Sequence, residues 1–313
     1  VAEYLGTNHT EMTVTQKDAL NLIPSILDTF DEPFADSSAI PTMLVSKLAK
    51  TQATMILSGD GGDELFMGYG AYRWAERLQK QSIKLLHKPL SFFLRQGNSW
   101  SKRGGNVLNY TNTENIPSHI FSQEQCLFSR KEISSILNPD LVRDIHLNEY
   151  PEVARTLSAG ENQALFDMNY YLREDLLPKV DRSSMKYSLE VRVPLLDYTI
   201  VEFALNLNEK LKVHGETQKY LLRQVLYDYV PSNLFVRPKW GFSIPLEKWL
   251  QSDLSFLIDD YLNDNLIRKT GIFNQKEVRK LVRKFKSGRN GYLYNRIWQI
   301  ILIQKFISDK FNK

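Results

Sequence analysis

The spacing of apolar and polar residues in the first sixty positions predicts strands and helices in the order β-α-α-β. The expected strands are a short one at 11–14 and one that ends at Leu57, and the expected helices run over about 15–31 and 41–50. This order is typical of a parallel sheet, which binds ligands at the carboxyl ends of its strands. We therefore predict an α/β fold with a ligand-binding loop after Leu57.

From about residue 70 onward the pattern is almost entirely helical, so helices dominate the predicted fold. Apolar residues over 83–94 recur with helical spacing. They could lie on a membrane, but their flanking charge is mild and we expect them to be core. The span 97–115 is polar and is predicted to be a surface connection. A long helix is predicted over 160–187, kinked at Pro178 because proline removes a backbone hydrogen bond.

The loop after the second strand combines glycines with carboxylates in the run Ser58-Gly59-Asp60-Gly61-Gly62-Asp63-Glu64. Glycines let a backbone turn sharply and approach a ligand closely. Asp60 and Asp63 would repel a bare phosphate, so a nucleotide here would bind through Mg²⁺, which accepts carboxylate and phosphate oxygens. The spacing excludes a dinucleotide fingerprint, a P-loop and an EF-hand. Local sequence alone leaves a tight surface turn and a ligand site equally open.

Composition narrows the class of protein without adding a site. The 313 residues are 42% hydrophobic and 24% charged, and the net charge of +4 is too small to imply nucleic acid or a membrane as a partner. A single cysteine, Cys126, excludes an internal disulfide framework and fits a reducing cytoplasm. No apolar run reaches the ~18 residues of a membrane span, and no signal peptide is recognisable.

Charged residues form patterns at the end of the long predicted helix and just beyond it. Asp181 and Arg182 belong to a charged helical half that would ordinarily be a solvated face. Glu190 and Arg192 alternate with apolar residues, and if they are buried they must pair with each other, because a lone buried charge is very costly. Taken alone, these charges are explained by structure.

Two further groups of basic residues follow. Lys219 and Arg223 lie one turn apart on a helix predicted over 217–229, which is mildly destabilising unless anions meet them. Nine basic residues lie within 268–289 opposite an apolar stripe. They could bind a polyanion, but an amphipathic surface helix explains them more simply.

Five stretches carry more information together than any one of them alone. They are Ser58-Gly59-Asp60-Gly61-Gly62-Asp63-Glu64-Leu65-Phe66, Lys179-Val180-Asp181-Arg182-Ser183-Ser184-Met185, Leu189-Glu190-Val191-Arg192-Val193-Pro194-Leu195-Leu196-Asp197, Lys219 with Leu222-Arg223, and Lys239-Trp240-Gly241-Phe242. In this order and spacing the set resembles the synthetase domain of glutamine-dependent asparagine synthetases. The resemblance extends from Val1 to about Phe306.

The resemblance implies a reaction and the groups that it needs. In that family ATP activates the side-chain carboxylate of aspartate as an acyl-adenylate and pyrophosphate leaves. Ammonia from a separate N-terminal glutaminase domain then displaces AMP. The resemblance also implies an adenine-nucleotide alpha-hydrolase-like (ATP pyrophosphatase) fold with a short parallel sheet and many helices. ATP and Mg²⁺ are the expected bound groups, the expected location is the cytoplasm, and family members often form homodimers.

The resemblance also assigns roles to loop residues. Asp63 matches the carboxylate that holds Mg²⁺, and Lys219 matches the lysine that stabilises pyrophosphate and the intermediate. Ser58 and Gly59 match the backbone that contacts ATP. Asp60 stands where many members carry a glutamate that positions the substrate or accepts a proton from ammonia.

Four charged residues match the side of the site that receives the acceptor. Asp181 and Arg182 look like part of the acceptor side. Glu190 with Arg192 looks like the ion pair that holds it.

Two features of the family are absent from this sequence: the Ser-Gly-Gly-x-Asp-Ser pyrophosphate loop and the N-terminal nucleophilic cysteine. Both lie upstream of the matching region in the family, so we expect the chain to be the C-terminal part of a longer protein that cannot make asparagine unaided. We expect 1–313 to be one synthetase domain. It would comprise a nucleotide-binding part (1–78), a variable helical part (79–158) and a helical lobe (159–313).

Two substitutions relative to the family leave the acceptor open. Asp60 is one methylene shorter than the usual glutamate, and Met67 replaces a usual glycine. Alternatives are therefore amidation of another carboxylate, such as a uronic acid of a surface polysaccharide, or an intramolecular ring closure. From a different class, the chain could be a catalytically inactive binding module, or it could bind a polyanion through 268–289.

Overall fold

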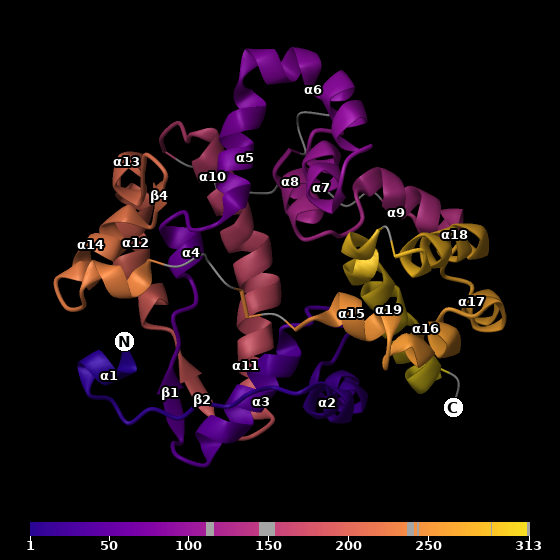
Figure 1. Ribbon diagram of the computed structural model, residues 1–313, viewed down its shortest axis with the longest axis horizontal. Coiled ribbons are helices and arrows are strands. Elements are labelled where there is room, and N and C mark those ends of the chain that lie inside the picture. Colours follow the sequence, from indigo (N-terminus) through magenta and orange to yellow (C-terminus); the bar gives the residue numbers. More distant parts are fainter. Residues whose placement is uncertain (111–115, 144–153, 237–240, 243, 289, 312–313) are drawn as a thin grey trace. The chain divides into compact units, whose positions relative to one another are not determined.

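The computed structural model describes residues 1–110, 116–143, 154–236, 241–242, 244–288 and 290–311 (Figure 1). Its internal contacts divide it into two compact units. The first comprises Val1–Ala19, Ser38–Tyr72 and Leu157–Ile244, and the second comprises Leu20–Ser37, Arg73–Thr156 and Pro245–Lys313. Both are mainly helical, and the first contains a short parallel sheet, which is consistent with an α/β domain.

The parallel sheet of the first unit consists of β1 (Met55–Leu57) and β2 (Glu190–Arg192), with Ile56 opposite Val191. The predicted strand at 11–14 is wrong, because that segment has no regular secondary structure, is largely exposed and pairs with none of the described strands. A short alternating run forms a strand only when an edge is available to pair with it. The edge of β1 pairs instead with β2, a segment that follows more than a hundred residues later.

Helices and a small antiparallel hairpin make up the rest of the first unit. Residues 65 and 66, at the end of a short helix, pack with Ala204 and Leu207 in a core cluster beside the loop after β1. The elements are α1 (Ala2–Leu5), α3 (Ala39–Lys50), α4 (Gly62–Leu65), α10 (Ala159–Phe166), the π-helix η2 (Asp167–Leu176), α11 (Leu177–Met185), η3 (Pro194–Leu196), α12 (Tyr198–Asn206), α13 (Glu209–Lys212), β3 (Val213–His214), β4 (Thr217–Gln218), α14 (Tyr220–Tyr227) and η4 (Ser232–Phe235).

The long helix predicted over 160–187 is present as the continuous series α10, η2 and α11. The predicted perturbation at Pro178 takes the form of a π-helix that ends just before it, with Pro178 in the first turn of α11. Proline removes one hydrogen bond and clashes with the preceding turn, and a wider turn accommodates both effects. The distortion therefore extends over the ten residues of η2.

The described part of the second unit is mainly helical, with one isolated antiparallel bridge between Leu137 and Phe273. The C-terminal helix α19 packs against α15, α16, α17 and α18, and its Ile297, Trp298 and Ile301 are fully buried. The elements are α2 (Gln16–Thr29), which begins in the first unit, α5 (Gly70–Gln79), which also begins there, α6 (Gln81–Leu94), α7 (Ser99–Val107), α8 (Ile116–Glu124), α9 (Arg130–Ile136), η1 (Pro139–Leu141), α15 (Leu246–Gln251), α16 (Ser255–Tyr261), α17 (Asp264–Thr270), α18 (Gln275–Lys286), η5 (Gly291–Leu293) and α19 (Tyr294–Phe311).

Two expectations for the second unit are wrong. The apolar stripe of 83–94 forms helix α6, but most of its large side chains are exposed instead of buried. The span predicted as a polar connection contains helix α7, which Asn98 caps by accepting a hydrogen bond from Ser101 N. Within the described residues, no helix combines the length and the apolar character needed to cross a bilayer.

Candidate active site

The loop after β1 starts as an extension of the sheet. Ser58 N donates a hydrogen bond of 2.9 Å to Arg192 O, which continues the ladder between β1 and β2 by one residue. The Ser58 hydroxyl then donates to the Asp60 carboxylate, and Asp60 N lies 3.3 Å from Ser58 Oγ. Asp60 is therefore held by its own loop, at the carboxyl end of a parallel strand, as the sequence predicts for a ligand-binding edge.

Two glycines close the turn that leads into α4. Gly61 has φ of 83°, and a Cβ atom there would lie only 2.4 Å from Leu196 Cδ2. At Gly62 a Cβ atom would approach Leu195 Cδ1 to 3.0 Å. Gly61 satisfies both the left-handed backbone and the tight packing, which no other residue does without strain. The turn directs the next residue, Asp63, into the first turn of α4.

Asp63 meets Lys219, which is more than 150 residues away in the sequence. Asp63 Oδ2 and Lys219 Nζ are 2.9 Å apart, and their side chains are 23% and 28% exposed, so the pair is accessible but partly shielded. Lys219 does not lie in a helix that starts at 217, as predicted. It follows β4 and occupies the N-cap position of α14 in the left-handed conformation, with φ of 54°. The Asp63 carboxylate is therefore an anion of the kind that Lys219 was expected to need.

Gly68 fits tightly behind this ion pair. Its amide donates a 2.7 Å hydrogen bond to Asp63 O. A Cβ atom on Gly68 would lie 2.0 Å from Asp63 Oδ1 and 2.3 Å from Lys219 Cε. The preceding residue, Met67, has φ of 56° and is buried. This left-handed conformation gives a physical reason for the glycine that is usual at that position.

Glu64, the next residue of α4, points away from solvent. It is 1% exposed, and its Oε1 accepts a 2.8 Å hydrogen bond from the Tyr69 hydroxyl. Burial raises the pKa of the Glu64 carboxyl, and the hydrogen bond from Tyr69 partly opposes that rise. The Tyr69 carbonyl in turn accepts a 2.8 Å hydrogen bond from Gln218 Nε2, which ties the segment just before Lys219 to the loop side of the site.

A second buried carboxyl lies in the same unit, on η2. Asp167 is 2% exposed and accepts a 3.1 Å hydrogen bond from Gln163 Nε2. Burial raises its pKa to about 7, against the hydrogen bond from Gln163, which lowers it. Sequence reasoning missed both buried carboxyls, Glu64 beside the site and Asp167 on η2. The available signal was their place on helix faces that also carry buried apolar residues.

The four predicted acceptor-side residues form two local pairs. Glu190 Oε1 and Arg192 Nε are 2.7 Å apart on one face of β2, and both side chains are more than half exposed, so this pair is not the buried one that we considered. Asp181 Oδ2 and Arg182 Nε are 3.9 Å apart on an exposed face of α11. Asp63 with Lys219 is thus the pair that joins distant predicted site residues.

A neighbouring contact on α11 was not predicted. Lys179 is buried, and its Nζ donates a 2.8 Å hydrogen bond to Ser38 Oγ at the start of α3. This bond joins segments 141 positions apart and fixes α11 against α3 near the sheet. Lys179 begins the motif whose later members, Asp181 and Arg182, are exposed.

The donor set fits Mg²⁺ that is bound together with phosphate. Among the described residues, no group of three or more His, Cys, Asp or Glu side chains is gathered to hold a metal by itself. Asp63 offers an accessible carboxylate, and Lys219 offers a cation beside it. Mg²⁺ typically takes one or two carboxylates and completes its coordination with water and substrate phosphates.

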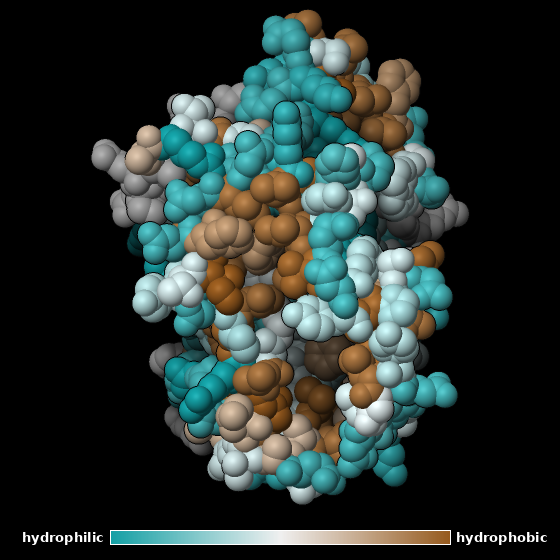
Figure 2. Space-filling view, turned by 90° about the vertical axis from the view of Figure 1, so that its left-hand side faces the viewer, coloured by the Kyte–Doolittle hydropathy of each residue, from teal (hydrophilic) through white to brown (hydrophobic). Residues whose placement is uncertain are grey.

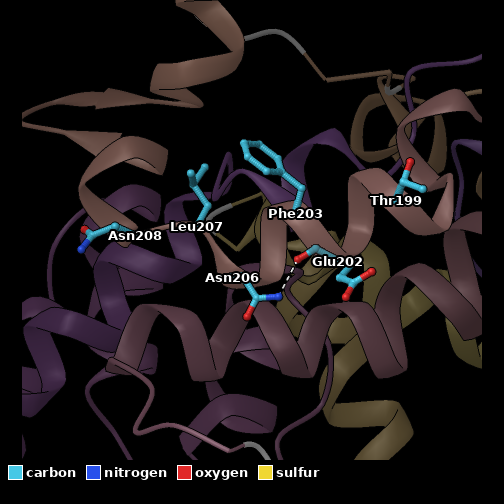
Figure 3. Close-up of a pocket in the computed structure, with 6 residues that line it drawn as sticks. All are labelled: Thr199, Glu202, Phe203, Asn206, Leu207 and Asn208. Atoms are coloured by element: carbon cyan, nitrogen blue, oxygen red, sulfur yellow. Dashed lines mark hydrogen bonds between the residues drawn. The ribbon is translucent and has the colours of Figure 1, made fainter.

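A shallow hollow of about 400 Å³ lies on the outer side of α12, and none of the predicted site residues lines it. Figure 3 shows Phe203 and Leu207 projecting on one side of the helix, with Asn206 donating to the Glu202 backbone carbonyl. Leu207 belongs to the core cluster that packs under α4. The hollow offers one carboxylate and no cation, so it does not suit a nucleotide.

The basic helix α18 of the second unit is explained as a surface helix. Its Val278, Leu281 and Phe285 are buried. On the other face, Arg279 pairs with Asp264 and Lys286 Nζ lies 2.8 Å from Asp259 Oδ1. These carboxylates neutralise part of the basic face, as is typical of amphipathic surface helices.

Comparisons with known proteins show the family of this chain. The family described as asparagine synthase matches residues 1–308. The glutamine-hydrolyzing asparagine synthetase 1 of Bacillus subtilis (strain 168) is 30% identical over 275 residues, which cover 84% of this chain and 42% of that protein. A putative glutamine-hydrolyzing asparagine synthetase of Mycobacterium bovis is 33% identical over 261 residues, 80% of this chain and 39% of that protein. The chain spans about two fifths of the length of these curated relatives, and it belongs to the asparagine synthase family.

Proposed function

We propose that this chain forms the synthetase site of an ATP-dependent ligase that converts aspartate and ammonia to asparagine, releasing AMP and pyrophosphate. The observation that carries the proposal is the 2.9 Å contact between Asp63 and Lys219 at the carboxyl end of β1. It joins the two residues that matter most in the resemblance. Both relatives named above are described as asparagine synthetases, which supports aspartate as the acceptor.

The charges of the pair suit attack on the α-phosphate of ATP. An aspartate carboxylate attacks that phosphorus, an acyl-adenylate forms and pyrophosphate leaves. Lys219 would neutralise the departing pyrophosphate, and Asp63 would hold Mg²⁺ against the phosphates. When bound, Mg²⁺ would offset the negative charge of the phosphates from a position that is already fixed before the reaction begins. The αL backbone at residue 219 directs the amine toward the carboxylate before any substrate arrives.

The other loop residues would bind ATP and the acceptor. Ser58 and Gly59 lie at the end of β1, where backbone groups can contact the nucleotide. Asp60 would take a proton from ammonia or position the acceptor, although its carboxylate is engaged by the Ser58 hydroxyl. We therefore also propose that substrate binding frees the Asp60 carboxylate from the Ser58 hydroxyl.

We assign the acceptor side to the four charged residues of α11 and β2. Asp181 and Arg182 are exposed on α11, and Glu190 and Arg192 are exposed on β2. Exposure leaves both pairs available to a polar acceptor, whose amine and carboxylate need opposite charges. Ammonia would come from a glutaminase domain on the same longer protein, and the enzyme would act in the cytoplasm as a homodimer.

The test is the rate of pyrophosphate release by the complete gene product with ATP, Mg²⁺, ammonia and aspartate. Replacing Lys219 by methionine, or Asp63 by asparagine, is expected to lower kcat/KM by ~10²-fold or more, the effect typical of losing one group that stabilises developing charge. Arg223→Met is the matched control, because Arg223 is an exposed cation one turn further along α14. Full activity in Lys219→Met would disprove the proposed role and favour a binding module.

A panel of acceptors separates aspartate from other carboxylates. Asp60 is shorter than the usual glutamate and is held by Ser58, so this loop is the place where an altered acceptor would be accommodated. If aspartate alone supports AMP formation, the aspartate assignment stands. If a uronic acid does so and aspartate does not, amidation of another acid replaces it.

A further inference from the structure

Helix α6 exposes most of its large apolar side chains, whereas its Ser91 and His87 face the protein. On the inner side, the Ser91 hydroxyl donates a 2.7 Å hydrogen bond to Gly105 O, and His87 stacks on Tyr110 at 4.2 Å between ring centroids. On the outer side, Leu85 is 73% exposed and Phe93 is 70% exposed. An amphipathic helix normally packs in the opposite sense, with its apolar stripe against the core. We therefore expect another surface to cover the outer face of α6.

The exposed apolar residues form one surface, which we call the α6 face. Positions 85, 86, 89, 90 and 93 recur with helical spacing on the outer side of α6. Figure 2 shows brown apolar side chains among teal hydrophilic ones at the level at which Figure 1 labels α6. The exposed large apolar members are Leu85, Leu86, Leu90, Phe92 and Phe93, and Trp100 on the neighbouring helix α7 is exposed as well.

The sequence segment that contains α6 carries charge of one sign. Seven of the chain's 40 basic residues and none of its 36 acidic residues lie within 77–110, so this segment alone exceeds the net charge of the whole chain, +4. The helix itself carries Lys84 and Lys88, and Lys80 and Arg95 flank it; all four are exposed. None of the ion pairs recorded among the described residues uses these four. These four exposed basic residues lie on or beside a helix whose outer face is apolar.

We propose that the α6 face docks this protein peripherally on an anionic lipid bilayer. Leucine and phenylalanine side chains would enter the boundary between headgroups and acyl chains, and the lysines would meet lipid phosphates. A helix is only about 10 Å across, so even lysines on its far side stay within about one Debye length of that surface. Trp100, 81% exposed, has the amphipathic ring that is enriched at membrane interfaces.

Charge favours lipid over a second copy of the chain. Face-to-face docking of two α6 faces would bring together eight basic residues, two sets of the four exposed on or beside α6, without acidic residues from 77–110. Figure 2 also shows apolar surface at the height of α12 and α14, but there the hollow beside it carries the acidic Glu202. The proposal revises our expectation from the sequence that a membrane is not a partner. It is independent of the proposed ligase activity.

The test is co-sedimentation of the chain with vesicles of phosphatidylcholine containing about one third phosphatidylserine, a content chosen to give a negative surface potential. Each basic residue near such a surface is worth roughly a fivefold gain in binding, so Lys84→Glu with Lys88→Glu should weaken binding at least about 30-fold. Phe92→Ser with Phe93→Ser should weaken it at least ~10-fold, because both side chains leave the acyl boundary. Both pairs are exposed, so folding measured by circular dichroism should be unchanged.

The matched control is Arg283→Glu with Lys284→Glu on α18, which reverses two charges on a basic helix whose apolar face is buried. It should keep most of the vesicle binding. Quenching of Trp100 fluorescence by brominated lipid, lost in Trp100→Phe, would add direct support for contact at the α6 face.

Four results would overturn the proposal. They are no binding to phosphatidylserine vesicles, equal binding to pure phosphatidylcholine, a loss of binding confined to the α18 control, and binding by this chain but not by the complete gene product. The last would show that another part of the protein covers the face. Concentration-dependent dimerisation that disappears in the Phe92 and Phe93 variant, without vesicle binding, would assign the face to a second copy instead.

Discussion

Replacing Gly68 by alanine should inactivate the proposed site without unfolding the protein. Its added Cβ would lie 2.0 Å from Asp63 Oδ1, 2.9 Å from Asp63 Cγ and 2.3 Å from Lys219 Cε. Gly68 does not have a left-handed backbone, so alanine adds no conformational strain there. The perturbation is therefore steric and is directed at the ion pair.

The size of the effect follows from these distances. Ordinary contacts with a Cβ atom begin near 3.4 Å, so the Asp63 carboxylate and the Lys219 side chain must each retreat by about 1 Å or more. A displacement of about 1 Å in a catalytic group can cost ~10²-fold in rate. The ion pair itself is about one quarter exposed, so its loss should cost no more than about 1 kcal/mol of stability. Alanine recovers ~0.4–1 kcal/mol by restricting the unfolded chain.

We therefore expect kcat/KM for ATP to fall about 100-fold in Gly68→Ala, with the unfolding midpoint nearly unchanged. Pyrophosphate release by the complete gene product measures the first quantity, and urea denaturation followed by circular dichroism measures the second. Gly104→Ala is the matched control, because a Cβ atom there meets Trp74 only at an ordinary 3.7 Å. Wild-type kinetics in Gly68→Ala would show that the Asp63 and Lys219 geometry is not the one used in catalysis.

Two further predictions concern buried charge. Burial raises the pKa of Asp167 to about 7, above its value in the unfolded chain. The folded state therefore binds the proton more tightly than the unfolded state. As a result, stability falls as pH rises from about 4 to about 7. Asp167→Asn should remove this pH dependence and raise the free energy of unfolding by up to about 4 kcal/mol at pH ~8, as measured by urea unfolding. An equal loss of stability in the variant at both ends of the pH range would contradict this expectation. In the second unit, Glu132→Ala removes the carboxylate that pairs with the guanidinium of Arg296, which is 7% exposed. The expected loss of stability is about 2 kcal/mol. This is less than for a fully buried pair, because Glu132 is 41% exposed. Glu132→Gln should cost less, since it keeps hydrogen-bond acceptance, and equal unfolding midpoints for Glu132→Ala and wild type would refute the role of the pair.

Local signals were sufficient for much of the fold. The glycines and aspartates after an apolar run predicted a strand, a loop and a helix start, and the structure has β1, the loop and α4 in that order. Pro178 predicted a distortion of a long helix, and η2 ends immediately before it. These features depend on backbone preferences that act over a few residues, so they can be derived from a single sequence.

Features that depend on distant partners were harder to predict. The segment at 11–14 has the alternation of a strand but pairs with nothing, whereas β2 was interpreted mainly through its charges. The stripe of α6 has the periodicity of a core helix, yet its polar residues Ser91 and His87 face the protein. Periodicity identifies a helix and its apolar face, but it does not say which face the rest of the chain will cover.

Lys219 shows how the site and the backbone constrain each other. A helix through 217 would have placed Lys219 and Arg223 side by side, with like charges one turn apart. The chain instead ends β4 at Gln218, whose side chain bonds to Tyr69 O, and turns through a left-handed Lys219 into α14. Glycine would adopt that conformation with less strain, but it would bring no amine to Asp63. A non-glycine residue held in this region of backbone space needs a compensating contact. The ion pair with Asp63 provides that contact, so the strained backbone at 219 and the chemistry proposed for the loop have one explanation.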